Sequence, residues 1–105
     1  MIYLVPTTAA NAWLKDKEYI VATDEGEAVA MACGEYLATG NKATVVMGDN
    51  GFLNALDALI TLVGMYSIPV NVRVYLRHDE PQHALVAKHA KKVAKLYGIK
   101  ARFID

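Results

Sequence analysis

The sequence lacks a second cysteine, an excess of either charge and a long apolar run, and each absence excludes a class of protein. Cys33 is the only cysteine, so neither an internal disulfide nor a cysteine-rich zinc site can form. Eleven Lys and Arg residues balance eleven Asp and Glu residues, so no net field draws the chain to nucleic acid or to an anionic membrane. The longest apolar stretch, residues 55–66, contains Asp57 and is too short to cross a bilayer. No basic leader precedes the first apolar run, and we therefore expect a cytoplasmic protein without nucleic-acid or membrane partners.

Common phosphate and metal motifs are also missing. The glycine-rich dinucleotide fingerprint and the GxxxxGK[ST] loop of nucleotide triphosphatases do not occur. A receiver domain would need an acidic pair for Mg²⁺ after the first strand, where Thr7 and Thr8 stand. The histidines are not spaced as a metal site, and Cys33 is expected to be a buried small hydrophobe in a helix. The sequence therefore predicts no metal site within this chain.

Short β-branched runs alternate with alanine- and leucine-rich runs along the chain. A hydrophobic fraction of 54% predicts an ordered chain, and 105 residues allow one domain, residues 1–105. The predicted strands are residues 2–5, 18–22, 42–47, 68–76 and 99–104. The predicted helices are residues 9–15, 25–39, 52–66 and 81–97. Thr7 and Thr8 are expected to cap the first helix and Gly40 to end the second, while residues 48–51 are expected to form a turn.

This alternation predicts an α/β protein with an open parallel sheet of five strands and helices on both faces. Ligands of such folds bind beyond the carboxyl ends of the strands. Polar residues gather at these ends in four places, which are residues 6–7, 24–25, 48–50 and 77–83. A functional site is expected along this edge of the sheet.

Four collinear stretches carry a family resemblance. They are residues 5–6 (VP), 23–40 (TDEGEAVAMACGEYLATG), 47–59 (MGDNGFLNALDAL), and 66–70 (YSIPV) with 79–83 (DEPQH). They resemble the pyrimidine-binding domain of thiamine-diphosphate-dependent 2-oxo-acid decarboxylases, in particular the phosphonopyruvate and sulfopyruvate decarboxylases. The resemblance covers nearly the whole chain. It implies the thiamine-diphosphate-binding fold, a flavodoxin-like arrangement of three αβα layers.

The resemblance implies that Glu25 is the catalytic residue. In this family a glutamate after the second strand hydrogen-bonds the pyrimidine ring of the cofactor and promotes the tautomer that removes the thiazolium proton. Glu27 is the competitor within the motif, but the two side chains are expected to point to different sides of the helix start. A first-turn acid that favours the helix dipole is the alternative role for Glu25. The implied cofactor contacts are Glu25, Gly48, Asp49, Asn50 and Phe52, and the implied substrate pocket is Pro6, Thr7 and His83.

The chain departs from the family pattern at Thr7, Gly48 and Leu53, where the family usually has an acid, a glutamine and a glycine. The run that holds Mg²⁺ and the diphosphate is missing, so Mg²⁺ is expected on a separate diphosphate-binding partner subunit. The apolar helix 52–66 predicts heavy burial and assembly, with that partner or as a homo-oligomer. The implied substrate is a small 2-oxo acid. The alternative is a non-catalytic protein of the same fold that binds a partner or a metabolite.

Overall fold

The computed structural model describes all residues, 1–105, and contains one parallel sheet of five strands. The strands are β1 (Ile2–Leu4), β2 (Tyr19–Val21), β3 (Thr44–Gly48), β4 (Asn71–Tyr75) and β5 (Arg102–Ile104). Their order across the sheet is β2-β1-β3-β4-β5, and every neighbouring pair is parallel. The predicted α/β class is confirmed, and the strand order is that of flavodoxin-like doubly wound folds.

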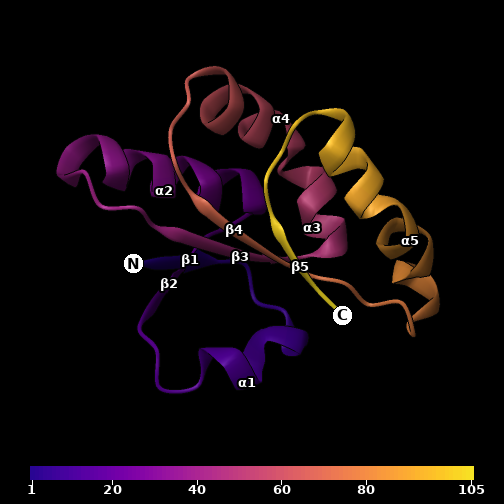
Figure 1. The fold of residues 1–105 in the computed structure, drawn as a ribbon. Helices are drawn as coiled ribbons and strands as arrows, with labels where there is room; N and C mark the ends of the chain where they lie inside the picture. Colours follow the sequence, from indigo (N-terminus) through magenta and orange to yellow (C-terminus); the bar gives the residue numbers. More distant parts are fainter.

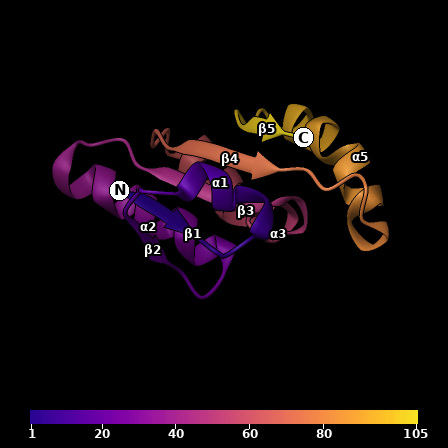
Figure 2. The same ribbon diagram turned by 90° about the horizontal axis from the view of Figure 1, so that it is seen from below.

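The helical segments cover the two faces of the sheet unequally. They are η1 (Thr8–Ala10), α1 (Asn11–Leu14), α2 (Glu25–Thr39), α3 (Asp49–Asn54), α4 (Leu56–Ala58), the π-helical η2 (Leu59–Met65) and α5 (Pro81–Leu96). Helices α2 to α5 lie together on one face, and α1 lies alone on the other (Figure 1). The view from below shows α1 over the β1–β3 side of the sheet (Figure 2).

The core follows this division. A cluster of 20 buried residues fills the space between the sheet and α2 to α5, and Val45, Met47 and Val74 in it have no exposed surface. A cluster of 5 buried residues lies under α1 and includes Leu14 and Val46. The central strand β3 is covered on both faces, which explains its continuous apolar character, whereas β4 alternates, with Val72 and Val74 buried and Asn71 and Arg73 less covered.

Helix α2 has the predicted bounds because both of its ends are capped. Asp24 accepts a hydrogen bond from the backbone nitrogen of Glu27 at 2.9 Å, which satisfies a free donor of the first turn. Gly40 ends the helix with φ of 76°, a conformation that costs glycine little. The expected caps of the first helix are wrong, because the Thr7 hydroxyl has no hydrogen-bond partner and the Thr8 hydroxyl accepts from Arg77 instead of capping the helix.

The predicted helix 52–66 is wrong in its start, its continuity and its burial. The chain becomes helical already at Asp49, so the expected turn at residues 48–51 does not form. Gly48 is extended, and the helix begins at Asp49 because an acidic residue in the first turn interacts favourably with the helix dipole. The helix is interrupted at Ala55 and continues as α4 and η2. Within residues 52–66 the buried residues are Phe52, Ala55 and Leu59 alone. Apolar character around the whole helix predicted more burial than this chain supplies, because most side chains of α4 and η2 are only partly buried against the core and Met65 is exposed.

No helix of the chain is both long enough and apolar enough to pass through a membrane.

Candidate functional site

Glu25 lies at the first position of α2, beyond the carboxyl end of β2, and its side chain turns toward α3. The side chain is half-buried, and its Oε1 accepts a hydrogen bond from Asn54 Nδ2 at 2.9 Å. Gly51 lies directly beneath the carboxyl group: a Cβ at residue 51 would come within 2.6 Å of Oε2. Oε2 itself makes no hydrogen bond. Glu25 therefore presents one held oxygen and one free oxygen at the expected edge of the sheet.

Glu27 has a different task, although it is only two residues away. Its Oε1 accepts a hydrogen bond from the backbone nitrogen of Thr23 at 2.9 Å, and its side chain is exposed. Asp24 accepts from the backbone nitrogen of Glu27, so both side chains stabilise the start of α2, although the partner of the Glu27 carboxylate is Thr23 and not the capping residue. The expectation that Glu25 and Glu27 point to different sides is confirmed.

A second polar cluster is centred on Asp49, at the junction of β3 and α3. Asp49 has no exposed surface, yet its carboxylate has three donors within 2.9 Å. Oδ1 accepts from the backbone nitrogen of Asn50 at 2.8 Å and lies 2.9 Å from His83 Nδ1. Oδ2 accepts from the backbone nitrogen of Arg77 at 2.9 Å. A buried carboxylate needs this degree of compensation.

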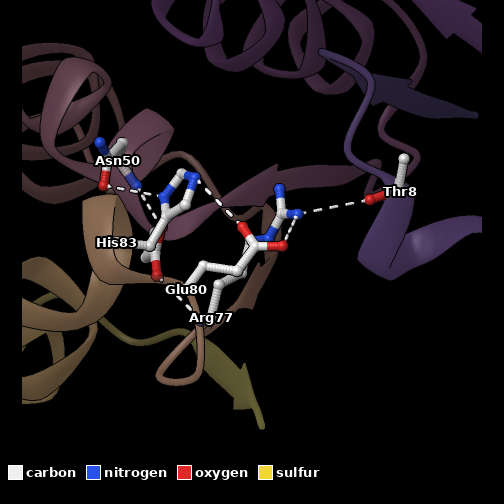
Figure 3. Close-up of polar contacts among 6 residues, drawn as sticks. Thr8, Asn50, Arg77, Glu80 and His83 are labelled. Carbon is white, nitrogen blue, oxygen red and sulfur yellow. Dashed lines mark hydrogen bonds and ion pairs between the residues drawn. The ribbon is translucent and has the colours of Figure 1, made fainter.

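His83 links Asp49 to the loop that leads from β4 into α5 (Figure 3). Its Nε2 lies 3.6 Å from Glu80 Oε2, and its Nδ1 lies 3.2 Å from Asn50 Oδ1. Glu80 Oε1 in turn accepts from Arg77 Nη2, and that guanidinium reaches Thr8 Oγ1 at 3.5 Å. The network joins three strand ends, those of β1, β3 and β4.

The remaining predicted site residues are Pro6 and Thr7 after β1, Gly48 at the end of β3, and Phe52 in α3. Thr7 Oγ1 is buried without a hydrogen-bond partner, and a Cβ at Gly48 would lie 3.7 Å from it, so the two residues face each other. Pro6 is exposed. Phe52 has no exposed surface and packs edge-on against Phe103, with ring centroids 5.5 Å apart.

The structure thus brings the predicted residues together in two groups on either side of α3. Glu25 faces Gly51 and Asn54, whereas Asp49, Asn50 and His83 share the other network. The predicted contacts of all these residues with a ligand stay predictions. For Asp49 and Phe52, a direct contact would require exposure that the isolated chain does not give them.

Sequence reasoning missed five residues that shape the two groups: Thr8, Gly51, Asn54, Arg77 and Glu80. Gly51 and Asn54 are three residues apart in α3 and so share one face, but the sequence predicts a turn at residues 48–51, which hides this spacing. Which side chain they meet depends on the packing of α2 against α3.

Cys33 lies apart from this edge, in the middle of α2. It is buried, as expected for a small core residue, and burial raises the pKa of its thiol. The chain has no group of three or more His, Cys, Asp or Glu side chains arranged to hold a metal ion.

The fold and the residues at the carboxyl edge of the sheet define an α/β protein with flavodoxin-like strand order and an acidic, partly open site beyond its strand ends. No protein-family model matches the chain. Among curated proteins it is similar to the sulfopyruvate decarboxylase subunit alpha of Methanococcus maripaludis, with 34% identity over 65 residues. The match covers 62% of this chain and 38% of that subunit. The chain therefore has weak homology to a decarboxylase subunit and matches well under half of its length.

Proposed function

We propose that this chain is the pyrimidine-binding subunit of a thiamine-diphosphate-dependent 2-oxo-acid decarboxylase of the phosphonopyruvate and sulfopyruvate type. The observation that carries the proposal is the Glu25 carboxyl group at the carboxyl edge of the sheet, with Oε1 held by Asn54 and Oε2 free. The similarity to a sulfopyruvate decarboxylase subunit alpha supports it independently.

The residues around Glu25 fit the pyrimidine end of such a cofactor. A planar ring with a basic nitrogen needs one carboxyl oxygen that can share a proton and an approach that no side chain blocks. Glu25 Oε2 supplies this oxygen. Residue 51 is a glycine, so no side chain projects from the part of α3 that adjoins it. When bound, thiamine diphosphate supplies the electron sink for loss of carbon dioxide from a 2-oxo acid. Glu25 holds or releases the proton at the ring nitrogen.

The diphosphate end of the cofactor does not fit this chain. In phosphate sites magnesium is held octahedrally by one or two carboxylates, waters and the phosphates, and Asp49, the acid after β3, is fully buried with both of its oxygens hydrogen-bonded within the chain. The nearby Arg77 guanidinium is already paired with Glu80. We place Mg²⁺ and the diphosphate on a separate partner subunit.

Exposed apolar residues next to the site support assembly with a partner or a second copy. Leu53 on α3 and Leu85 on α5 are 40% and 70% exposed, and they border a groove of about 230 Å³ whose other lining residues are Val86, His89, Ala90 and Val93. Met65 and Tyr66 lie away from the site, where η2 leads toward the amino end of β4, and are 71% and 66% exposed. Clusters of exposed apolar side chains, such as those that border the groove, mark interaction sites.

The decisive experiment on the proposal compares two glutamates. Glu25→Gln should slow thiazolium proton exchange of thiamine diphosphate by roughly 10² to 10⁴, the contribution of a positioned acid-base group. Glu27→Gln is the matched control, since that side chain only caps α2, and it should change the rate far less. The rate is measured on the complex of this chain with its diphosphate-binding partner. Equal losses in both variants would show that Glu25 is the wrong residue.

Assembly is tested by light scattering at micromolar concentration. The unmodified chain should be larger than one copy, alone or with the partner, and Leu53→Glu should shift it toward the monomer because a charge would have to be buried. Lys88→Glu is the control, since Lys88 is an exposed charged residue of α5. A monomer that no partner changes would contradict this part of the proposal.

A second function, that of a non-catalytic binding module, is favoured by one observation. Asp49 and Phe52, which the family resemblance assigns to the cofactor, are both fully buried. Absence of cofactor-dependent exchange in the unmodified complex would support this alternative.

A further inference from the structure

The Glu25 side chain does not extend into solvent but lies against α3, over Gly51. A Cβ at residue 51 would meet Glu25 Oε2 at 2.6 Å and both Cδ and Cγ at 2.7 Å. Non-bonded heavy atoms do not approach so closely. Only glycine at residue 51 therefore lets the carboxyl group occupy this place.

Asn54 completes the contact from the same face of α3, three residues after Gly51. Its Nδ2 donates to Glu25 Oε1 at 2.9 Å. An ionised carboxylate only accepts hydrogen bonds, so the amide nitrogen is the group that must face it. One oxygen is thereby fixed, and the rotation that would exchange the two oxygens is restrained.

We infer that Gly51 and Asn54 are positioning residues, which hold the Glu25 carboxyl group in one conformation and leave Oε2 for the ligand. The inference rests on the proposed function for its chemical purpose. A free glutamate samples many rotamers, and ordering it on binding costs affinity and rate; a side chain that is already held avoids that cost. The two residues act through Glu25 and need not touch the ligand.

A plain packing role would produce the same contacts, so the test must separate placement from stability. Gly51→Ala does this, because the displaced atoms are the end of a flexible side chain and α3 gains a better helix former. The Gly51→Ala variant should stay folded, while the Glu25 carboxyl group moves away from its place over residue 51. Gly34→Ala is the matched control, since a Cβ there meets nothing within 4 Å.

The first measurement needs no cofactor. In ¹⁵N NMR spectra of the full chain, the Asn54 side-chain amide pair is identified by its loss in Asn54→Asp. Gly51→Ala and Glu25→Gln should shift this pair, whereas Gly34→Ala and Glu27→Gln should leave it in place. An unmoved pair in Gly51→Ala overturns the inference, whatever the fate of the proposed function.

The second measurement is thiazolium proton exchange of thiamine diphosphate in the complex with the partner subunit. Gly51→Ala should lower the saturated rate by roughly 10- to 100-fold, as a misplaced catalytic group does. The concentration for half-saturation should change by less than about threefold. A change in half-saturation alone, with an unchanged saturated rate, overturns the positioning role. No exchange in the unmodified complex refutes the proposed function instead, and the NMR result then decides whether Glu25 is held.

Discussion

Asp49 and Glu25 are two carboxylates at the same edge of one sheet, and they are held in opposite ways. Asp49 is fully buried and faces three donors, from Asn50, Arg77 and His83. Glu25 is half-buried and has a single donor, Asn54. A carboxylate that is fully buried, with a donor on each oxygen, can fix structure but presents no exposed oxygen to a ligand. The open one is the group suited to chemistry.

Their positions in the sheet explain the difference. Asp49 follows β3, the middle strand, so the ends of neighbouring strands and the start of α5 surround it and supply donors. Glu25 follows β2, which is an edge strand with a neighbour on one side only. Glu25 meets α3 on the inner side, toward β3, and no strand lies on its outer side. An acid after an edge strand stays available because the sheet has no further strand to cover it.

The comparison predicts its largest effect at Asp49. Asp49→Ala should lower the free energy of unfolding by about 3 kcal/mol, because two backbone donors and His83 lose their acceptor in a buried place. Glu25→Ala should cost less than about 1 kcal/mol, because its one partner can turn to water. Urea unfolding measures both, with Asp57→Ala as the control for loss of an exposed helical acid. Equal losses at residues 49 and 25 would remove the distinction between a structural and an available carboxylate.

The sequence was sufficient where local chemistry decides the structure. The cap at Asp24 and the glycine at residue 40 set both ends of α2, and the alternation of runs set the parallel sheet. It was insufficient for the stretch after β3. The break at Ala55 and the π-helical turns of η2 depend on how α4 and η2 meet α2, and apolar periodicity does not contain that information.

The candidate site divides along the same line. Glu25 and Asp49 could be placed at strand ends from the sequence, because strand ends of a parallel sheet share an edge. Their different burial could not, since it follows from the order of strands across the sheet. The same holds for Asn54, whose donor meets Glu25 across 29 positions of the chain.

Glu35 offers an intermediate case at the opposite edge. It accepts from the Tyr3 hydroxyl at 2.9 Å and pairs with the terminal amine at 3.3 Å. Burial, followed by the Glu35 carboxylate, raises the pKa of Tyr3 above its ordinary 10.0. The unfolded chain then loses the phenolic proton first as the pH rises. The raised pKa therefore corresponds to a contribution to the free energy of unfolding. This contribution is fully present below about pH 10 and is lost as the pH rises through the folded-state pKa of Tyr3.

Tyr3→Phe should lower the free energy of unfolding by about 1 kcal/mol near neutral pH, less than the loss at Asp49. It should also flatten the decline of that free energy above about pH 10.

Burial also raises the pKa of the Cys33 thiol above 9.0. A separate decline of the free energy of unfolding therefore begins near pH 9, and Cys33→Ala should remove it. Urea unfolding across this alkaline range, with each variant alone, measures the two contributions. An unchanged alkaline decline in Tyr3→Phe would show that the phenol is not its source.

The smallest effect is expected at Glu80, on the outer side of the Asp49 network. Its side chain is 33% exposed and that of its partner Arg77 is 23% exposed, and its Oε2 lies 3.6 Å from His83 Nε2, too far for a hydrogen bond. Partly exposed ion pairs gain little over hydration and are screened by salt. Glu80→Gln should therefore lower the free energy of unfolding by less than about 0.5 kcal/mol, and about 0.5 M NaCl should remove most of that loss. Urea unfolding at two salt concentrations measures it, beside Asp49→Ala, whose loss should persist because the Asp49 carboxylate itself has no exposed surface. A salt-insensitive loss at Glu80 as large as that at Asp49 would contradict this prediction. It would mean that residues 77–83 stabilise the fold as one unit with Asp49, and that Glu25 is the one carboxylate among the three that stays available to a ligand.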